Sequence, residues 1–398
     1  MKEGRLAIVG AGSSGLVTLK NALDRLPGWD IICYEKGDDA IGCWGNPYPG
    51  FVSTSTKFTT QFTSHRKWDC RVDPADRESR EDFFKGDEYG RYLTGFSEEH
   101  GLARHIRKNA TVEMIEKDVK GWRLWIDGEA EVFDRLIICT GLAEKPKVID
   151  SPVPSLRSLD EPPHQQTIVV IGGGESAADI AHRLAEPSLG NRVYLSLKSG
   201  IRVSPRYHPI RGVPSDFLRN RLMLSIHQRL RNAIGQKFVE ARIRHREKFE
   251  RFFGSRAESS DVSASVTAKR KSWDAKLTAG AKDQLFSVFH TKSDDFLDDV
   301  AADRITIIGP PCDDGYRSFR GFDDSSVHTI EADAIYPMIG YSSGLSEISD
   351  GEVLIRDFHL GCLHVRHDDL FLVGFARPII GNVPTISEMQ AKDRKSVV

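Results

Sequence analysis

Three glycines near the start of the chain, Gly10, Gly12 and Gly15, form a G-x-G-x-x-G pattern directly after a short apolar segment. The first glycine allows a tight turn, the second lets a pyrophosphate approach bare backbone, and the third lets a helix pack on the strand. The helix expected over Leu16–Leu26 directs its N-terminal N–H groups at the phosphates. With Ser14 inside the loop, this stretch predicts a dinucleotide-binding site.

An acidic residue, Glu35, ends the second expected strand, Asp30–Tyr34, twenty residues after Gly15, and Lys36 follows it. A carboxylate at about this spacing accepts hydrogen bonds from ribose hydroxyls. Strand, glycines, helix, second strand and acid agree in order and distance. A coincidental glycine-rich turn is therefore the weaker alternative.

The opening pattern returns in the middle of the chain. An apolar strand is expected at Thr167–Ile171, and Gly172 and Gly174 then occupy the first two glycine positions. Ala177 stands in the third, where a small residue suffices for close helix packing. The chain therefore contains a second predicted dinucleotide site.

The second site differs in charge from the first. Its next strand, expected at Val193–Leu197, ends in Lys198 rather than an acid, with Arg202 and Arg206 close behind. Cations suit a 2′-phosphate, whereas an acid suits a free 2′-hydroxyl, so this half favours NADP over NAD. Ordinary surface charges at a strand end are the alternative. Two such sites in one chain are typical of a flavoprotein reduced by NADPH.

Both sites require parallel α/β layers to position them. We expect an α/β fold with two Rossmann-like domains, in which an NADP domain is inserted into an FAD domain and carries a helical insertion. The expected boundaries are 1–150 for the first part of the FAD domain, 151–166 for a Pro-rich linker, 167–342 for the NADP domain with its insertion at about 215–300, and 343–398 for the C-terminal part of the FAD domain.

Further elements follow from periodicity and turn residues. The pattern predicts a helix over Asp87–His100, a hairpin or meander over Arg104–Asp127, and a second helix over Lys282–Val300. Residues 215–253 are helical in pattern and densely basic, and Ser255–Ala268 is Ser-rich and expected to be mobile. The basic run could be a solvated face, a docking surface or a lid over a substrate.

The bulk composition excludes several classes of protein. The 55 basic residues nearly balance the 57 acidic ones, which argues against a nucleic-acid partner. Six scattered cysteines without a C-x-x-C pair argue for reduced thiols and against a zinc site or a dithiol centre, so we expect no metal. The chain has no signal-like start and no run of about eighteen apolar residues. We therefore expect a cytoplasmic protein without a transmembrane segment; a homodimer is compatible with the sequence.

The last six residues, 393–398, back-translate to a common sequencing-adapter read. Our hypothesis is that they are an assembly artefact and that the native protein continues past about Lys392. Resequencing the gene tests this hypothesis, and a native stop codon after Val398 would refute it.

Taken together, the motifs resemble the flavin-containing monooxygenase family over most of the chain. The resemblance rests on G-A-G-S-S-G, E-K followed by I-G-C-W, Y-P-G-F-V-S-T-S-T-K, the C-T-G strand end, G-G-G-E-S-A-A-D-I-A, L-S-L-K-S-G, M-I-G-Y and G-F-A-R-P-I-I-G-N-V-P-T-I-S-E-M-Q-A. The last motif is the most distinctive of them.

The resemblance implies roles for matching positions. Those implied for FAD are Gly10, Gly12, Ser14, Gly15, Glu35 and Lys36 at the pyrophosphate and ribose, Trp44 near the flavin or ribityl chain, Val112 near the adenine, Thr140 under the phosphates and Gln390 at the flavin end. Those implied for NADP are Gly172, Gly174, Glu175 and Ser176 at the pyrophosphate and Lys198 and Arg206 near the 2′-phosphate.

Three departures from the family pattern concern the chemistry. The family's T-N-T is Ser53-Thr54-Ser55 here, so Thr54 replaces the asparagine that supports the oxygenated flavin. The F-x-G-x-x-x-H linker motif is missing, and A-T-G-Y is replaced by M-I-G-Y. By family position, Thr54, Lys57 and Gln61 are candidates for the catalytic face of the flavin, with an ordinary Thr-rich supporting loop as the alternative.

The resemblance implies an NADPH- and FAD-dependent monooxygenase. Such an enzyme inserts one oxygen atom of O₂, through a C4a-hydroperoxyflavin, into an amine nitrogen, a sulfide sulfur or a ketone of a small-molecule substrate. The loss of the asparagine favours one alternative, an NADPH-dependent flavin oxidase or reductase that releases peroxide. Another alternative is a non-catalytic FAD- and NADP-binding module that regulates a partner through its basic insertion.

Overall fold

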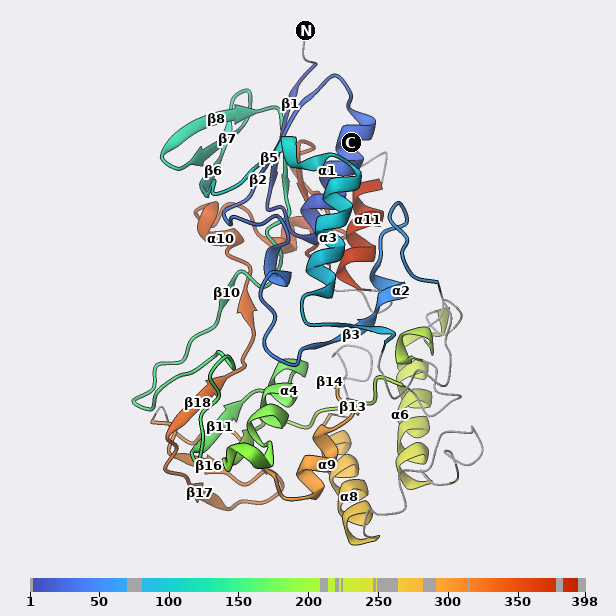
Figure 1. The fold of residues 1–398 in the computed structure, drawn as a ribbon, viewed down its shortest axis with the longest axis vertical. Helices are drawn as coiled ribbons and strands as arrows, with labels where there is room; N and C mark the ends of the chain where they lie inside the picture. Colours follow the sequence, from blue (N-terminus) through green and yellow to red (C-terminus); the bar gives the residue numbers. More distant parts are fainter. Residues whose placement is uncertain are drawn as a thin grey trace. The chain divides into compact units, whose positions relative to one another are not determined.

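The computed structural model describes residues 3–69, 81–207, 214–218, 222, 225–245, 248, 264–281, 291–313, 315–376 and 382–392. The chain divides into two compact units (Figure 1). Unit 1 contains Asp82–Pro146 with the described residues before 70 and after 340, and unit 2 is built on Lys147–Gly340. The hypothesis about residues 393–398 lies outside the described residues.

Unit 1 is organised around a seven-stranded sheet. Its order is β20 (Phe358–His359), β21 (Leu363–His364), β22 (Leu370–Leu372), β9 (Arg135–Ile138), β1 (Arg5–Val9), β2 (Asp30–Tyr34) and β5 (Ile106–Arg107). The strands from β22 to β5 are parallel. Central parallel strands are covered on both faces and therefore read as continuous apolar runs, which is how β1 and β9 stand out in the sequence.

The two faces of this sheet are covered by different elements. Leu6 and Ile8 of β1 point into a core shared with α1 (Ser13–Arg25) and α3 (Glu88–Glu99), against which α11 (Val383–Lys392) also packs. Ala7 and Val9 point the other way, into a core with the meander β6 (Val112–Asp118), β7 (Gly121–Ile126) and β8 (Glu129–Phe133). Helix α1 begins at Ser13, earlier than expected, because Gly12 caps it in an extended conformation.

Smaller elements complete unit 1. They are η1 (Gly42–Trp44), β3 (Val52–Thr56), α2 (Lys57–Thr60), β4 (Phe83–Lys85), η3 (Leu102–His105), β10 (Lys145–Pro146), β19 (Tyr341–Ser342), α10 (Leu345–Ile348) and η7 (Ile355–Asp357). Strand β3 pairs with β4, and β10 pairs with β19.

Unit 2 contains a parallel sheet in the order β15 (Ile305–Ile308), β12 (Arg192–Ser196), β11 (Thr167–Ile171) and β18 (Ala334–Pro337). The helices α4 (Glu175–Leu184) and α9 (Phe296–Ala301) accompany it, with η4 (Pro187–Leu189) and the hairpin β16 (Ser318–Arg320) and β17 (Val327–Thr329). The predicted α/β class with two parallel dinucleotide-type sheets is thus confirmed. Residues 151–166, predicted as a linker, pack on this sheet, because Leu156 N donates to Ile335 O and Ile335 N to Pro154 O.

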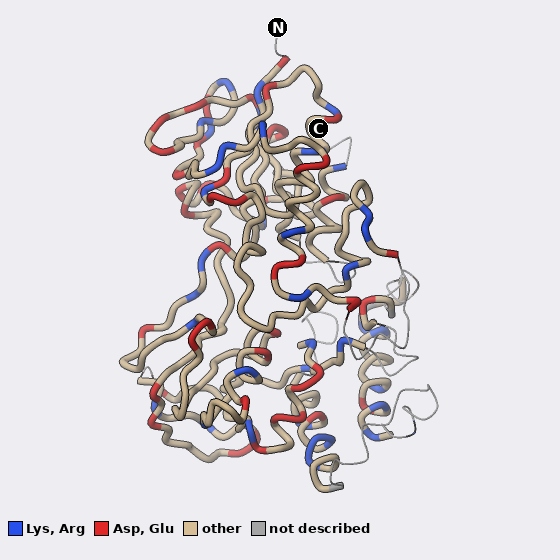
Figure 2. Tube along the Cα trace, viewed as in Figure 1, with Lys and Arg blue, Asp and Glu red and all other residues tan. Residues whose placement is uncertain are grey.

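The insertion in unit 2 contains η5 (Ser215–Leu218), α6 (Gln228–Arg244) and α8 (Ala264–Gly280), beside the short pair β13 (Val203–Ser204) and β14 (Thr291–Lys292). Figure 2 shows basic residues repeating along α6. The Ser-rich stretch expected to be mobile as far as Ala268 is instead helical from Ala264 onward, where Ala, Lys and Arg favour a helix. The helix expected over 282–300 is wrong at its described start, because Thr291 N donates to Arg202 O in a strand and α9 begins only after Ser293.

Among the described residues, no helix is both long enough and apolar enough to cross a membrane.

Candidate active site

The first glycine loop is closed tightly on its own backbone. Gly10 has φ +96°, and a Cβ there would lie 2.9 Å from the carbonyl oxygen of Cys139. A Cβ on Gly15 would lie 1.8 Å from the carbonyl oxygen of Gly10. Only glycine can occupy either position without moving main chain. The loop therefore has the geometry that the G-x-G-x-x-G pattern predicts.

The N-terminus of α1 is lined by bare backbone. Gly12 caps the helix without a side-chain hydrogen bond, and the first turn contains no acidic residue. Opposite it lies Gly42, and a Cβ on Gly12 would stand 3.5 Å from the Cα of Gly42. First-turn N–H groups that no cap satisfies are a ready site for an anion.

Glu35 is buried, with 7 % of its surface exposed, and faces this loop. One carboxylate oxygen accepts from Ala11 N at 2.8 Å, and the other accepts from Gly37 N at 2.9 Å. These two main-chain donors hold the charge in place. Lys36, its neighbour, is exposed and forms an ion pair with Glu144.

Thr140, two residues beyond β9, carries the most informative polar atom of the site. Its Oγ1 is buried and has no hydrogen-bond partner among the described residues. It adjoins the glycine loop, since a Cβ on Gly10 would lie 3.2 Å from the Cα of Thr140. Buried hydroxyls normally have a partner, so a ligand oxygen at this point would complete its hydrogen bonding.

Trp44 is connected to the glycine loop through Tyr89, which the sequence analysis did not identify. The two rings pack edge to face at 4.8 Å, and the Tyr89 hydroxyl lies 2.8 Å from Ser13 Oγ. Complete burial raises the pKa of Tyr89, so the hydroxyl keeps its proton. Tyr89 belongs to no motif, and its only sequence signal was the expected helix around it.

Three further predicted FAD residues are engaged inside unit 1. The Oγ atoms of Ser14 and Ser387 lie 2.8 Å apart. The amide of Gln390 accepts from Gly374 N at 3.2 Å, so it braces a turn of the main chain. Val112 is buried at the start of β6. A contact of any of them with FAD stays a prediction.

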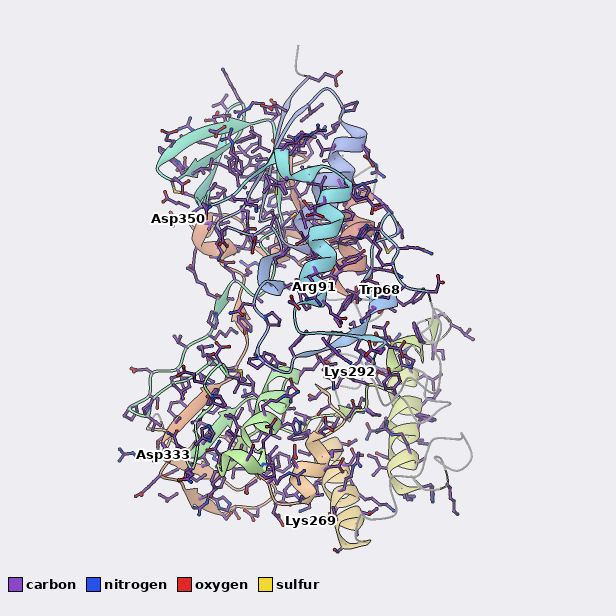
Figure 3. All side chains as sticks on the ribbon, in the orientation of Figure 1. Trp68, Arg91, Lys269, Lys292, Asp333 and Asp350 are labelled. Atoms are coloured by element: carbon purple, nitrogen blue, oxygen red, sulfur yellow. The ribbon has the colours of Figure 1, made fainter. Side chains whose placement is uncertain are left out.

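The predicted catalytic residues occupy β3, α2 and the residue after it. Thr54 lies between Val52 and Thr56, where the β3–β4 register shifts, an irregularity that is common beside active sites. Lys57 is buried, and its Nζ lies 3.1 Å from Glu88 and 5.9 Å from the ring of Trp68, which Figure 3 labels. A buried ammonium needs such a partner.

Gln61 closes the loop that follows α2. Its Nε2 donates to Trp68 O at 2.6 Å, and its Oε1 accepts from the N–H groups of Lys67 and Trp68 at 2.9 Å and 3.1 Å. This amide therefore supports the loop, as the alternative of a structural Thr-rich segment expects. Its place at the flavin face stays a prediction.

The second glycine loop is closed at its first glycine, like the first loop, but open at its second. Gly172 has φ +136°, and a Cβ there would lie 2.3 Å from Met338 O, whereas a Cβ on Gly174 would meet no atom within 4 Å. Gly174 caps α4 without a side-chain hydrogen bond. Glu175 is the first residue of α4, and Ser176 is exposed beside it.

The two predicted 2′-phosphate residues differ in environment. Lys198 is exposed just beyond β12. Arg206 is buried. Its main-chain N–H donates to the Asp294 carboxylate at 2.9 Å, and its guanidinium lies 3.4 Å from the same carboxylate. The charge of Arg206 is therefore already balanced in part, which leaves Lys198 as the more available cation.

The family of the chain follows from comparison with known proteins. The model of the flavin-binding monooxygenase-like family matches residues 3–268. A 4-hydroxybenzoate brominase (decarboxylating) of Marinomonas mediterranea is 24 % identical over 98 % of this chain and 72 % of its own length. Flavin-containing monooxygenase 5 of Rattus norvegicus is 25 % identical over 62 % of this chain and 50 % of its own length. The chain thus spans about half the length of such mammalian relatives.

Solved structures share the fold. OTEMO in complex with FAD and NADP superposes with a TM-score of 0.65 at 15 % identity, covering 98 % of this chain and 84 % of its own. Cyclohexanone monooxygenase from Rhodococcus sp. Phi1 bound to NADP⁺ gives 0.61 at 15 % identity, covering 98 % and 82 %. The resemblance seen in the sequence motifs is confirmed: this chain belongs to the flavin-binding monooxygenase-like family.

Proposed function

We propose that the chain is an FAD- and NADPH-dependent monooxygenase that transfers one atom of O₂ to a small molecule and reduces the other to water. The observation that carries the proposal is the buried, unpartnered Thr140 hydroxyl beside the uncapped N-terminus of α1. A polar ligand at this place supplies what both lack. The family match makes FAD that ligand.

In this proposal each residue of the first loop has a physical task. Gly10 and Gly15 close the turn, and Gly12 leaves room for the pyrophosphate at the N–H groups of α1. The Thr140 hydroxyl donates to a phosphate oxygen, and Glu35 accepts from ribose hydroxyls while Ala11 N holds its carboxylate. When bound, FAD supplies the redox chemistry that links NADPH to O₂.

The second loop takes the NADP pyrophosphate in the same proposal. Gly174 leaves open space at the N-terminus of α4, and Glu175 and Ser176 border it. Lys198 and, less directly, Arg206 favour the 2′-phosphate. Thr54 and Lys57 are proposed to line the reactive face of the flavin.

The substrate proposed first is a small molecule with a nucleophilic amine or sulfide, or a ketone. A second candidate reaction is favoured by a specific observation. Two relatives named 4-hydroxybenzoate brominase (decarboxylating) align with 98 % and 97 % of this chain, more than the mammalian relatives do. In that reaction NADPH and O₂ would oxidise bromide, an aromatic carbon would exchange its carboxylate for bromine, and CO₂ and water would be released.

The test is product analysis with the purified holoenzyme, NADPH and isotopically labelled O₂. The test substrates are an alkyl aryl sulfide, dimethylaniline and cyclohexanone, and we expect labelled oxygen in the sulfoxide, N-oxide or lactone formed from at least one of them. Bromophenol from 4-hydroxybenzoate and bromide, without labelled product from the other substrates, would instead favour the second candidate. NADPH consumption that yields only peroxide would refute oxygenation, and a protein that takes up no flavin would refute the whole proposal.

A further inference from the structure

Helix α11 and the residue just before it are bonded to α2, the short helix that carries Lys57. Asn382 donates from Nδ2 to Thr59 O at 3.1 Å and to Thr60 Oγ1 at 2.7 Å. The hydroxyl of Thr385 donates to the same Thr59 carbonyl at 2.5 Å. Because α2 has only four residues, these external bonds contribute much of what holds it in place.

One turn further along α11, Glu388 bonds to Thr63, which lies two residues after Gln61. It is 2 % exposed. Its carboxylate accepts from Thr63 N at 3.0 Å and from Thr63 Oγ1 at 2.5 Å, and it also lies 2.8 Å from Lys392 Nζ. A buried carboxylate with charge-assisted bonds to a main-chain N–H defines the position of that main chain strongly.

Helix α11 is also bonded to the first glycine loop. Ser387 is fully buried and contacts Ser14 Oγ of α1 at 2.8 Å. At the far end, Arg25 of α1 donates to Lys392 O at 2.7 Å. Helix α11 is thus bonded to both ends of α1, through Ser387 and Lys392, and also to the segment 57–63.

We propose that α11 sets the distance between the phosphate-binding loop and segment 57–63, and that Glu388 is a positioning residue for the flavin environment. The inference rests on the proposed function, since it needs FAD in unit 1. It assigns a task to the glutamate of E-M-Q-A that differs from cofactor contact. Glu388 acts through Thr63, and Ser387 acts through Ser14.

The test compares the holoenzymes of Glu388→Gln and Met389→Gln, with Thr63→Val as a milder variant. Met389 is next on the helix and 63 % exposed, so it is a matched control. In Glu388→Gln one amide N–H would face the Thr63 N–H, and the segment would shift. We expect a visible flavin spectrum changed from the control and a roughly 10- to 100-fold lower ratio of product to peroxide, as for small misplacements at active sites.

A readout that needs no cofactor is hydrogen exchange of segment 57–63 in the apoprotein. We expect faster exchange in Glu388→Gln than in Met389→Gln, with a smaller increase in Thr63→Val. Unchanged exchange, spectrum and coupling in Glu388→Gln would overturn the inference. So would a Glu388→Gln protein that only loses stability while Thr63→Val keeps the control's spectrum and coupling. Absence of flavin from the wild-type protein and from Met389→Gln would instead refute the proposed function.

Discussion

The two glycine loops share a sequence pattern but differ in the space around their glycines and in the charged residue that follows the next strand. In the first, Gly15 packs on the Gly10 carbonyl, and Glu35 is buried and held by two main-chain N–H groups. In the second, Gly174 faces open space, and the exposed Lys198 lies just beyond strand β12. We call the first the closed loop, because no side chain fits at Gly15, and the second the open loop, because it carries Ala177 at that position and has open space at Gly174.

This difference matches two kinds of ligand. A preorganised, buried site loses little conformational entropy on binding and suits a cofactor that stays bound. An open site with an exposed cation favours encounter with an anionic ligand and permits its release. For the proposed function we therefore expect the closed loop in unit 1 to keep FAD bound and the open loop in unit 2 to exchange NADP.

The largest expected difference is between two glycine-to-alanine variants, one in each loop. In Gly15→Ala the new Cβ would stand 1.8 Å from the Gly10 carbonyl oxygen, so the loop must open. We expect loss of bound FAD and a decrease of about 1–3 kcal/mol in the free energy of unfolding. In Gly174→Ala the Cβ has free space, so folding should be unchanged. Denaturant unfolding gives the free energy of unfolding of each variant, and absorbance of the purified protein gives its FAD content. Equal stability and equal FAD content in the two variants would contradict the comparison.

Glu35→Gln probes the buried acid of the closed loop. The amide can accept from only one of the two N–H groups, Ala11 or Gly37, and leaves the other facing an NH₂ group. We expect FAD binding to weaken by about 1–3 kcal/mol, measured by titration of the apoprotein. Asp38→Asn, an exposed neighbouring carboxylate, is the control. Unchanged FAD affinity in Glu35→Gln would show that the closed loop does not use this carboxylate.

Lys198→Ala probes the exposed cation of the open loop. Removing its charge should raise the KM for NADPH roughly tenfold and leave that for NADH nearly unchanged, because only NADPH carries the 2′-phosphate. The effect should shrink at high salt. Lys237→Ala, an exposed lysine on α6, should change neither value. Parallel loss with both nucleotides would assign Lys198 to another role.

The smallest effect concerns pH, and the two units should respond in opposite directions. In unit 2, the carboxylate of Asp299, 2.5 Å from His182 Nδ1, raises the pKa of His182 above 6.5. In unit 1, burial lowers the pKa of His65 below 6.5, although its hydrogen bond to Glu99 opposes this.

The sign follows for each histidine. His182 contributes stability that is present below pH 6.5 and lost as the pH rises through its higher folded pKa. His65 contributes stability that is present above pH 6.5 and lost as the pH falls through its lower folded pKa. Unfolding curves between about pH 5 and about pH 8, repeated with His182→Asn and His65→Asn, should separate the two slopes. Slopes of the same sign would contradict this assignment.

The sequence determined the parts of each site that one short segment makes. Gly10, Gly15 and Gly172 sit where only glycine fits, and Asp30–Tyr34 and Thr167–Ile171 are strands within the predicted bounds. These features are local, because spacing along one strand, turn and helix fixes which atoms meet.

The tertiary structure alone decided which distant side chains support those segments. Tyr89 reaches Ser13, Glu388 reaches Thr63, and Arg206 turns to Asp294 instead of remaining open like Lys198. None of these partners is near the other in sequence, and no period or motif signals the pair. Such contacts depend on how helices and strands pack around a common core, and that packing is a property of the whole fold.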